Sequence, residues 1–349
     1  MHGADNTDKK VYIRADGNSN IGMGHIMRCL SIADSFKAKG MDLTFVIADD
    51  GFEPLIKERG FQAIVLGTAY DHMEEEMNKW SPEEGSIVLV DSYYVTDTYL
   101  RWIKSQIGES GRLVYVDDVY SFAYPVDELI NYNAYGERVV YKKIYANAGV
   151  PSPKLILGLG YAPLRTMFRG LEKRLQPHQV KNVLVSTGGS DSLHLALRTT
   201  EYLKTNPSEY IFHILLGKMN QDKEEIQRNA GANVALHENV ADMKSLISSC
   251  DIAVSAAGST MYEIFACGVP FITYSTADNQ IFGAECLDKM GIAHNCGDFR
   301  LIESPETIII NAVERLAADY DRRVRVGAKM QELVDGYGAD RIVEEIIEN

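Results

Sequence analysis

The sequence predicts an α/β protein built from two Rossmann-like domains that face a cleft. The chain has 349 residues, which corresponds to two domains at about 150 residues per domain. Short apolar runs alternate with longer segments of helical periodicity, a pattern typical of βαβ units and a parallel sheet. The alternation starts again in the second half, so two α/β domains of similar size are expected. A ligand usually binds between two such domains.

In the first half, five short apolar runs are predicted to be strands, and the clearest helix follows the first of them. The strands are expected at residues 11–13, 43–47, 63–66, 87–90 and 113–116. The helix is expected over residues 26–39, where Leu30, Ala33 and Phe36 lie on one face. Residues 1–10 are polar and lack the apolar segment of a signal peptide, so we expect an N-terminal extension there. Residues 11–165 are assigned to the first domain.

The second half repeats this pattern after residues 151–174, which are predicted to be a linker because glycines and prolines interrupt any long element there. Strands are expected at residues 183–185, 211–216, 234–236, 252–254 and 271–273. Helices are expected at residues 191–203, 243–249, 260–266, 305–316 and 340–348. Residues 175–349 are therefore assigned to the second domain.

Charge and cysteine content argue against several classes of function. The net charge of −14 disfavours nucleic acid or an anionic membrane surface as a partner. The five cysteines are scattered and form no C-x-x-C pair, which fits a reducing compartment and neither disulfides nor zinc. No apolar run reaches the roughly 18 residues of a membrane span. We expect a cytoplasmic monomer that needs no metal or cofactor and that holds any anionic ligand through local donors.

The first candidate site is the glycine-rich loop after the first predicted strand. The loop contains Gly17, Gly22 and Gly24, and His25 follows where a helix should begin. Glycines let the backbone approach a ligand closely, and the free N–H groups of a helix start suit a phosphate. We predict that the loop contacts a phosphate or a sugar and that His25 is a general base. An ordinary tight turn with a partly buried structural histidine is an equal alternative.

The second candidate site is the Ser-Thr-Gly-Gly-Ser-Asp segment at residues 186–191, directly after the first strand of the second half. We predict that Gly188, Gly189 and Ser190 hold a pyrophosphate. Asp191 is expected to cap the next helix instead, since a carboxylate would repel phosphate. The alternative is a well-capped turn without a ligand.

The third candidate site is the start of the predicted helix at residues 260–266. Gly258 and Ser259 are small enough to leave room for a nucleotide at this helix start, and Glu263 could accept hydrogen bonds from both ribose hydroxyls. The structural alternative is a capping box, because Thr260 and Glu263 have the required spacing. Tyr93, after the strand at 87–90, faces the cleft in one interpretation and packs at a domain edge in the other.

Taken together, these motifs resemble a known family. The motifs are Ile13-Arg-Ala-Asp16 with Ile21-Gly-Met-Gly-His-Ile-Met-Arg28, and Ser255-Ala-Ala-Gly-Ser-Thr-Met-Tyr-Glu263 with Asn279-Gln280. In this order and at this separation they resemble the UDP-sugar hydrolase of pseudaminic acid biosynthesis and the related spore-coat polysaccharide proteins. The resemblance covers almost the whole chain after Lys10. It implies the glycosyltransferase-B fold, also seen in MurG-type transferases, with a sugar-binding catalytic domain followed by a UDP-binding domain.

The resemblance also implies a reaction and a set of residues. The family hydrolyses UDP-2,4-diacetamido-2,4,6-trideoxy-β-L-altropyranose to UDP and the free sugar without a metal, by attack of water on the anomeric carbon. His25 would assist the water, and Tyr93 and Asn279 would lie near the sugar. Residues that would contact the substrate are Asp16, Gly22, Gly24, Arg28, Gly188, Gly189, Ser190, Val240, Gly258, Ser259, Thr260, Glu263 and Gln280.

Two alternatives to hydrolysis stay open at this point. The segment Gly258-Ser-Thr260 is closer to the transferase relatives than to some hydrolases, which favours a glycosyltransferase that uses a UDP-sugar donor with a sugar or lipid acceptor. A non-catalytic protein that binds nucleotide sugars would share the same motifs, but it would release no product.

Overall fold

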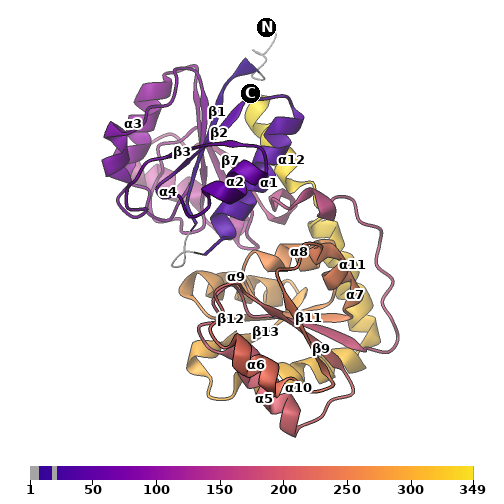
Figure 1. The fold of residues 1–349 in the computed structure, drawn as a ribbon. Helices are drawn as coiled ribbons and strands as arrows, with labels where there is room; N and C mark the ends of the chain where they lie inside the picture. The colour runs from indigo at the N-terminus through magenta and orange to yellow at the C-terminus, as the bar shows by residue number, and fades with distance from the viewer. Residues whose placement is uncertain (1–7, 18–21, 349) are drawn as a thin grey trace. The chain divides into compact units, whose positions relative to one another are not determined.

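The computed structural model describes residues 8–17 and 22–348, and it divides the chain into two compact units. The first unit comprises Met1–Arg165 with Tyr337–Asn349, and the second comprises Thr166–Gly336 (Figure 1). Most of the predicted N-terminal extension and Ile21 of the first motif lie outside the described residues. Over the described ranges, no helix has both the length and the apolar character that crossing a membrane requires.

The first unit contains a parallel sheet of seven strands in the order β3-β2-β1-β4-β5-β6-β7. The strands are β1 Val11–Ala15, β2 Leu43–Ile47, β3 Gln62–Val65, β4 Ile87–Asp91, β5 Arg112–Val116, β6 Glu128–Asn131 and β7 Lys154–Leu157. Every residue of β1, β2 and β4 is buried, as expected of central strands with both faces covered.

Helices cover both faces of this first sheet. The helices are α1 Gly24–Ala38, α2 Glu53–Glu58, α3 Asp97–Ile107, α4 Tyr141–Ala148 and α12 Gly338–Ile347. Apolar residues of α3 and α4 share a buried cluster with residues of β1, β4, β5 and β6, and α1 packs with α12 on the other face (Figure 1).

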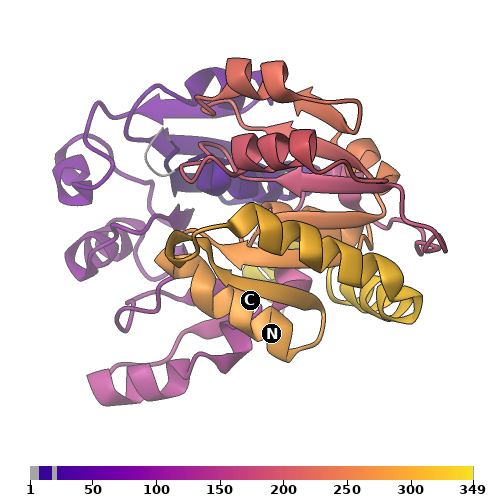
Figure 2. The same ribbon diagram turned by 90° about the horizontal axis from the view of Figure 1, so that it is seen from below.

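The second unit contains a parallel sheet of six strands in the order β10-β9-β8-β11-β12-β13. The strands are β8 Asn182–Ser186, β9 Ile211–Leu216, β10 Val234–Glu238, β11 Ile252–Ala256, β12 Phe271–Ser275 and β13 Ala293–Asp298. The helices are α5 Leu195–Thr205, α6 Lys223–Asn229, α7 Met243–Ser249, α8 Thr260–Ala266, α9 Asp278–Lys289, α10 Pro305–Ala318 and α11 Tyr320–Leu333. Figure 2 shows the face of this sheet on which α5, α6 and α10 lie. Apolar residues of these three helices pack against the strands and form the core of the second unit.

Two predictions about the organisation of the chain need correction. Residues 151–174 are not a linker throughout, because β7 lies among them and pairs with β6 at the edge of the first sheet. Residues 175–349 do not all belong to the second unit, because α12 returns to the first. There the hydroxyl of Ser35 donates to Asp340 Oδ1 at 2.7 Å, and Lys154 Nζ lies 2.7 Å from Glu345 Oε2. These contacts hold the last helix against the first sheet and α1.

Candidate functional site

The predicted site residues follow the strands at which each sheet reverses its order. The order changes direction between β1 and β4 in the first sheet and between β8 and β11 in the second. In open parallel sheets, ligands bind at the carboxyl ends of the strands at such a switch point. His25 follows β1 and Tyr93 follows β4, while Gly188–Ser190 follows β8 and Gly258–Thr260 follows β11. Each unit therefore gathers its own candidate residues at one place in its sheet.

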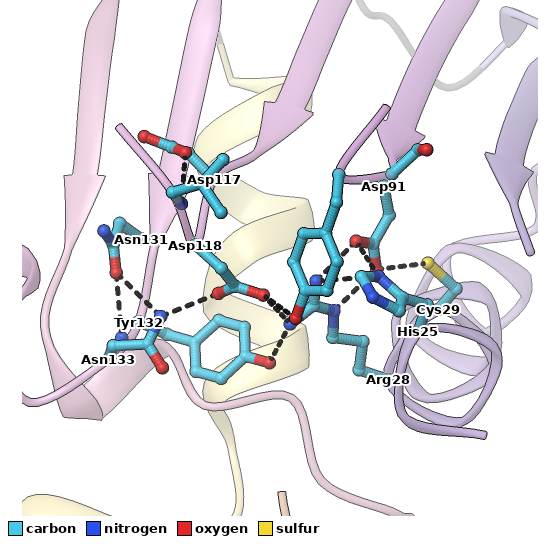
Figure 3. A network of polar contacts seen from close by, with 12 residues as sticks. His25, Arg28, Cys29, Asp91, Asp117, Asp118, Asn131, Tyr132 and Asn133 are labelled. Carbon is cyan, nitrogen blue, oxygen red and sulfur yellow. Dashed lines mark hydrogen bonds and ion pairs between the residues drawn. The ribbon is translucent and has the colours of Figure 1, made fainter. Parts of the chain in front are cut away.

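His25 lies in the first turn of α1, and its ring contacts two residues at the end of β4 (Figure 3). Its Nδ1 is 2.6 Å from Asp91 Oδ1, and its ring meets the ring of Tyr93 edge-on with centroids 4.5 Å apart. The side chain is only 6% exposed. Because an ionised carboxylate only accepts hydrogen bonds, the contact with Asp91 favours a neutral ring with its proton on Nδ1. Arg28 Nη2, which can only donate, lies 3.1 Å from the same Nδ1, but it donates to Asp91 Oδ1. The ring then presents Nε2 as an acceptor, which is the form that a general base needs.

Asp91 is the last residue of β4, and its carboxylate is buried among donors. Arg28, one turn after His25, donates from Nε to Asp91 Oδ2 at 2.5 Å and from Nη2 to Asp91 Oδ1. The Cys29 thiol donates to the same Oδ2 at 3.3 Å. Burial alone would raise the pKa of Asp91, but the charges of Arg28 and His25 and their hydrogen bonds outweigh burial and hold that pKa well below its usual range. Asp91 therefore stays ionised and keeps orienting His25.

Asp118 follows β5 and lies beside Arg28 (Figure 3). Its Oδ2 accepts hydrogen bonds from Arg28 Nη1 at 2.7 Å and from the Tyr93 hydroxyl at 3.3 Å. Its Oδ1 accepts from Asn133 Nδ2 at 2.7 Å. Arg28 Nη1 also donates to the hydroxyl of Tyr132 at 2.7 Å. All three guanidinium nitrogens of Arg28 thus bind partners inside the first unit, and a contact of Arg28 with substrate remains a prediction.

Asp16, Gly22 and Gly24 belong to the same loop region. Asp16 is buried, its Oδ1 accepts the N–H of Ala48 at 2.9 Å, and its Oδ2 lies 2.6 Å from Arg14 Nη1. These contacts join the ends of β1 and β2, so they give Asp16 a structural role beside its predicted contact with substrate. Gly22 has a φ of +77°, where a side chain would be strained, and Gly24 is the first residue of α1.

In the second unit, Gly188–Ser190 forms an exposed turn after β8. A Cβ added to Gly217 would overlap the carbonyl oxygens of both Gly188 and Gly189, and Gly189 O accepts the N–H of Met219 at 3.2 Å. The described peptide bonds are trans, so each N–H points opposite to the carbonyl of the same peptide group. The N–H groups of Gly189 and Ser190 therefore point away from Gly217. Neither has an acceptor within residues 8–17 and 22–348, and two adjacent N–H groups of this kind suit an anion.

Asp191 caps α5, which confirms the prediction made for it. Its Oδ1 accepts the N–H of Leu195 and its Oδ2 the N–H of Ala196, both at 2.9 Å. The carboxylate therefore occupies donors at the start of this helix, which leaves the turn at Gly188–Ser190 as the nearby source of backbone donors. Burial raises the pKa of Asp191, although its hydrogen bonds act in the opposite direction.

The remaining predicted residues follow β10, β11 and β12 of the second sheet. Ser259 is the N-cap of α8 and makes no capping bond through its side chain, so Thr260 does not hold the N-cap position that the predicted capping box requires. Gln280 Oε1 accepts the N–H of Thr276 at 2.8 Å and so closes the start of α9. The other predicted residues here are Gly258 after β11, Val240 after β10, and the exposed Asn279 in the first turn of α9. Because these strands are parallel, their carboxyl ends share one edge of the sheet.

Two acids that hold His25, Arg28 and Tyr93 in place, Asp91 and Asp118, are missing from the residues predicted from the sequence. Each is an acid at the end of an apolar strand, and that position was a usable signal. Their pairing with Arg28 depends on strand order, which places β4 between β1 and β5. In the part of the chain that the structure describes, no group of three or more His, Cys, Asp or Glu side chains is arranged to hold a metal ion.

Comparison with known proteins gives relatives at low identity over most of the chain, and no protein-family model matches it. The spore coat polysaccharide biosynthesis protein SpsG of Bacillus subtilis is 25% identical over 337 residues, which cover 95% of this chain and 96% of SpsG. The UDP-2,4-diacetamido-2,4,6-trideoxy-β-L-altropyranose hydrolase of Campylobacter jejuni is 26% identical over 289 residues, which cover 81% of this chain and 97% of that enzyme. The uncharacterized protein MJ1062 of Methanocaldococcus jannaschii is 22% identical over 290 residues, and the match spans only 57% of its length.

Solved structures of glycosyltransferases share the fold. MurG of Acinetobacter baumannii superimposes with a TM-score of 0.66 at 16% identity, covering 97% of this chain and 99% of that structure. The calicheamicin glycosyltransferase CalG4 superimposes with a TM-score of 0.63 at 14% identity, covering 97% of this chain and 98% of that structure. The predicted α/β class with two Rossmann-like units is confirmed. The chain is a homologue of SpsG and of the UDP-diacetamido-trideoxy-altropyranose hydrolase, and it has the glycosyltransferase-B fold.

Proposed function

We propose that this protein is a hydrolase that releases UDP and a free diacetamido-trideoxy sugar from a UDP-sugar. This reaction would belong to the biosynthesis of a pseudaminic-acid-type nonulosonate or of a surface polysaccharide. One observation supports it most: the 2.6 Å contact between His25 Nδ1 and Asp91 Oδ1. This contact fixes the tautomer in which Nε2 can take a proton, as a base that activates water requires.

In the proposed reaction, a water molecule donates a proton to His25 Nε2 while its oxygen attacks the anomeric carbon. The new C–O bond forms as the bond from that carbon to the diphosphate oxygen breaks, and the diphosphate keeps the electron pair. Asp91 stabilises the imidazolium that results. General-base assistance of this kind contributes about 10²–10⁴-fold to a rate. Tyr93, whose ring packs on His25, and Asn279 would contact the sugar.

The second unit would hold UDP. The N–H groups of Gly189 and Ser190 would bind the diphosphate, and backbone donors aimed at the departing charge lower the barrier without a cation. Glu263 would accept hydrogen bonds from the ribose hydroxyls, and the backbone at Val240 would contact uracil. The other predicted contacts are those of Gly188, Gly258, Ser259, Thr260 and Gln280 in this unit, and of Asp16, Gly22, Gly24 and Arg28 in the first unit.

A panel of UDP-sugars, incubated with chelator and followed by NMR, tests this proposal. We expect a UDP-sugar to yield UDP and a free sugar in the presence of chelator. His25→Ala should lower kcat by at least about 100-fold, while calorimetry should give an unchanged Kd for UDP. Unchanged turnover in this variant would remove His25 from its role, and UDP binding without any product would favour a binding protein.

A glycosyltransferase is the second candidate, and a specific similarity favours it. An N-acetylglucosamine transferase of Glaesserella parasuis, which acts on pyrophosphoryl-undecaprenol substrates, is 29% identical over 178 residues, 48% of this chain. Release of UDP in the absence of any acceptor separates the candidates. A hydrolase releases UDP at its full rate under these conditions, whereas a transferase needs the acceptor.

A further inference from the structure

The Tyr93 hydroxyl donates a hydrogen bond to Asp118. The hydroxyl lies 3.3 Å from Asp118 Oδ2. The other polar contacts of this carboxylate come from Arg28 Nη1 and Asn133 Nδ2, each at 2.7 Å. A guanidinium and an amide NH₂ can only donate, so these contacts match an ionised, accepting carboxylate. The hydrogen in the contact with Tyr93 therefore belongs to the phenol.

Asp118 is itself held firmly in place. The preceding residue, Asp117, accepts the N–H groups of Val119 and Tyr120 at 2.9 and 2.8 Å, which closes the turn after β5. The hydroxyl of Tyr135 donates to the carbonyl oxygen of Asp118 at 2.9 Å. The carboxylate therefore cannot swing away from Tyr93 without breaking contacts on both its backbone and its side chain.

The base and the phenol are oriented in the same manner. Asp91 accepts a hydrogen bond from His25 Nδ1, Asp118 accepts one from the Tyr93 hydroxyl, and Arg28 bridges the two carboxylates (Figure 3). The His25 and Tyr93 rings are in edge-on contact. Two neighbouring groups are thus set to accept hydrogen bonds from whatever occupies the site.

We infer that Asp118 is a positioning residue that makes Tyr93 a hydrogen-bond acceptor, so that the site selects a sugar with a hydroxyl or amide N–H facing Tyr93. This inference rests on the proposed function, because it assumes that a nucleotide sugar is the ligand. It also assigns Tyr93 no role as the acid that protonates the leaving group. A sugar with an ether or fluorine at that position would place lone pairs against lone pairs, and the penalty should be about tenfold or more in affinity.

The test compares a UDP-sugar that the wild-type protein binds with analogues in which one donor at a time is replaced by fluorine or O-methyl. Kd from calorimetry is measured for each, together with kcat/KM where turnover occurs. The wild-type protein should reject one analogue by about tenfold or more. Tyr93→Phe should remove that discrimination. Asp118→Ala should also remove it, because the freed hydroxyl can then donate to the ligand.

Two further variants separate positioning from simple loss of structure. Asp118→Asn keeps an oxygen that can accept from Tyr93, so the discrimination should persist. Tyr132→Phe removes a different partner of Arg28. In this variant, the ratio of the Kd for the analogue to the Kd for the UDP-sugar should match the ratio in the wild-type protein. The inference is overturned if Asp118→Ala discriminates between the UDP-sugar and its analogues as strongly as the wild-type protein does. It is also overturned if the wild-type protein binds every analogue as tightly as the UDP-sugar. If the wild-type protein binds no UDP-sugar at all, the proposed function fails and the inference fails with it.

Discussion

The two units share one architecture, but different groups lie at their switch points: buried charged side chains in the first unit and exposed backbone N–H groups in the second. In the first unit, His25 and Tyr93 are held by buried charges, with Arg28 between Asp91 and Asp118. In the second unit, the corresponding turn, Gly188–Ser190, is exposed and offers backbone N–H groups. A group that must transfer a proton needs a fixed tautomer and orientation, which surrounding side chains provide in the first unit. An anion can be held by the backbone alone, so small residues suffice.

The largest expected effect lies in the charged network of the first unit. Asp91→Asn removes the carboxylate charge and puts an NH₂ donor in place of one accepting oxygen, so His25 Nδ1 loses the carboxylate that holds its proton and kcat should fall by about 10²–10⁴-fold. The Kd for UDP, measured by calorimetry, should not change, because the predicted UDP site lies in the second unit. Cys29→Ser is the matched control, since a hydroxyl can still donate to Asp91 Oδ2. Equal losses in both variants would point to damage to the fold rather than to the tautomer.

The next effect concerns a buried acid of the first unit that lies outside the candidate site. Glu128, the first residue of β6, is fully buried, and burial raises its pKa to about 7, although Arg112 acts in the opposite direction. A carboxyl whose pKa is raised on folding makes the protein less stable as pH rises from about 4.5 to about 7. This shift corresponds to about 3 kcal/mol. Glu128→Gln should remove that pH dependence and be the more stable form at pH 8.

Urea unfolding at pH 5 and pH 8, followed by tryptophan fluorescence, measures this effect in the first unit alone. Both tryptophans of the chain, Trp80 and Trp102, lie in that unit. If the free energy of unfolding changes equally between pH 5 and pH 8 in the wild-type and Glu128→Gln proteins, Glu128 does not titrate in this range.

A smaller effect is expected at the turn of the second unit. Gly217→Ala would push a Cβ into the carbonyl oxygens of Gly188 and Gly189, so the turn must shift and its N–H groups must turn with it. The Kd for UDP should rise by about tenfold, since lost hydrogen bonds to a charged group are worth about 1.5–3 kcal/mol. Gly231→Ala, where a Cβ meets only a side-chain atom of Asn233 at 3.4 Å, should leave the Kd unchanged. Equal Kd values in the two variants would separate UDP binding from the Gly188–Ser190 turn.

The smallest effect separates capping from ligand binding. Asp191→Ala removes the cap of α5 and should lower the free energy of unfolding by about 1 kcal/mol, measured by urea unfolding with circular dichroism. Asp191→Asn retains an acceptor and should lose less. The Kd for UDP should not weaken in Asp191→Asn, because Asp191 is a cap and not a ligand contact. A clear rise in that Kd would give the carboxylate a part in binding.

The fold follows from the sequence wherever strands are apolar. All five strands predicted in each half exist, but β6, β7 and β13 were missed. β6 begins with Glu128 and ends with Asn131, so its apolar run is only two residues long. Prolines precede β7, and β13 has the largely polar sequence Ala-His-Asn-Cys-Gly-Asp. The last two are edge strands, where partial exposure tolerates polar residues and erases the apolar run that marks a buried strand.

The site is only partly visible in the sequence. The glycine loops and His25 stand out because turns and helix starts have local signatures. The acids that hold His25 and Tyr93 do not stand out. Asp91 is 66 positions from His25 and Asp118 is 25 positions from Tyr93 along the chain, and both come into place through the pairing of β1 with β4 and of β4 with β5. Such pairing depends on long-range packing, which no local spacing encodes.

The return of α12 to the first unit has a consequence for how the protein is made. During synthesis, residues 166–336 are translated before the helix that completes the first unit. Until then the apolar face of α1 against which α12 packs lacks its cover. The unit that carries His25 is therefore completed after the other, and a nonsense codon before Gly338 would remove one helix of that unit while leaving residues 166–336 encoded in full.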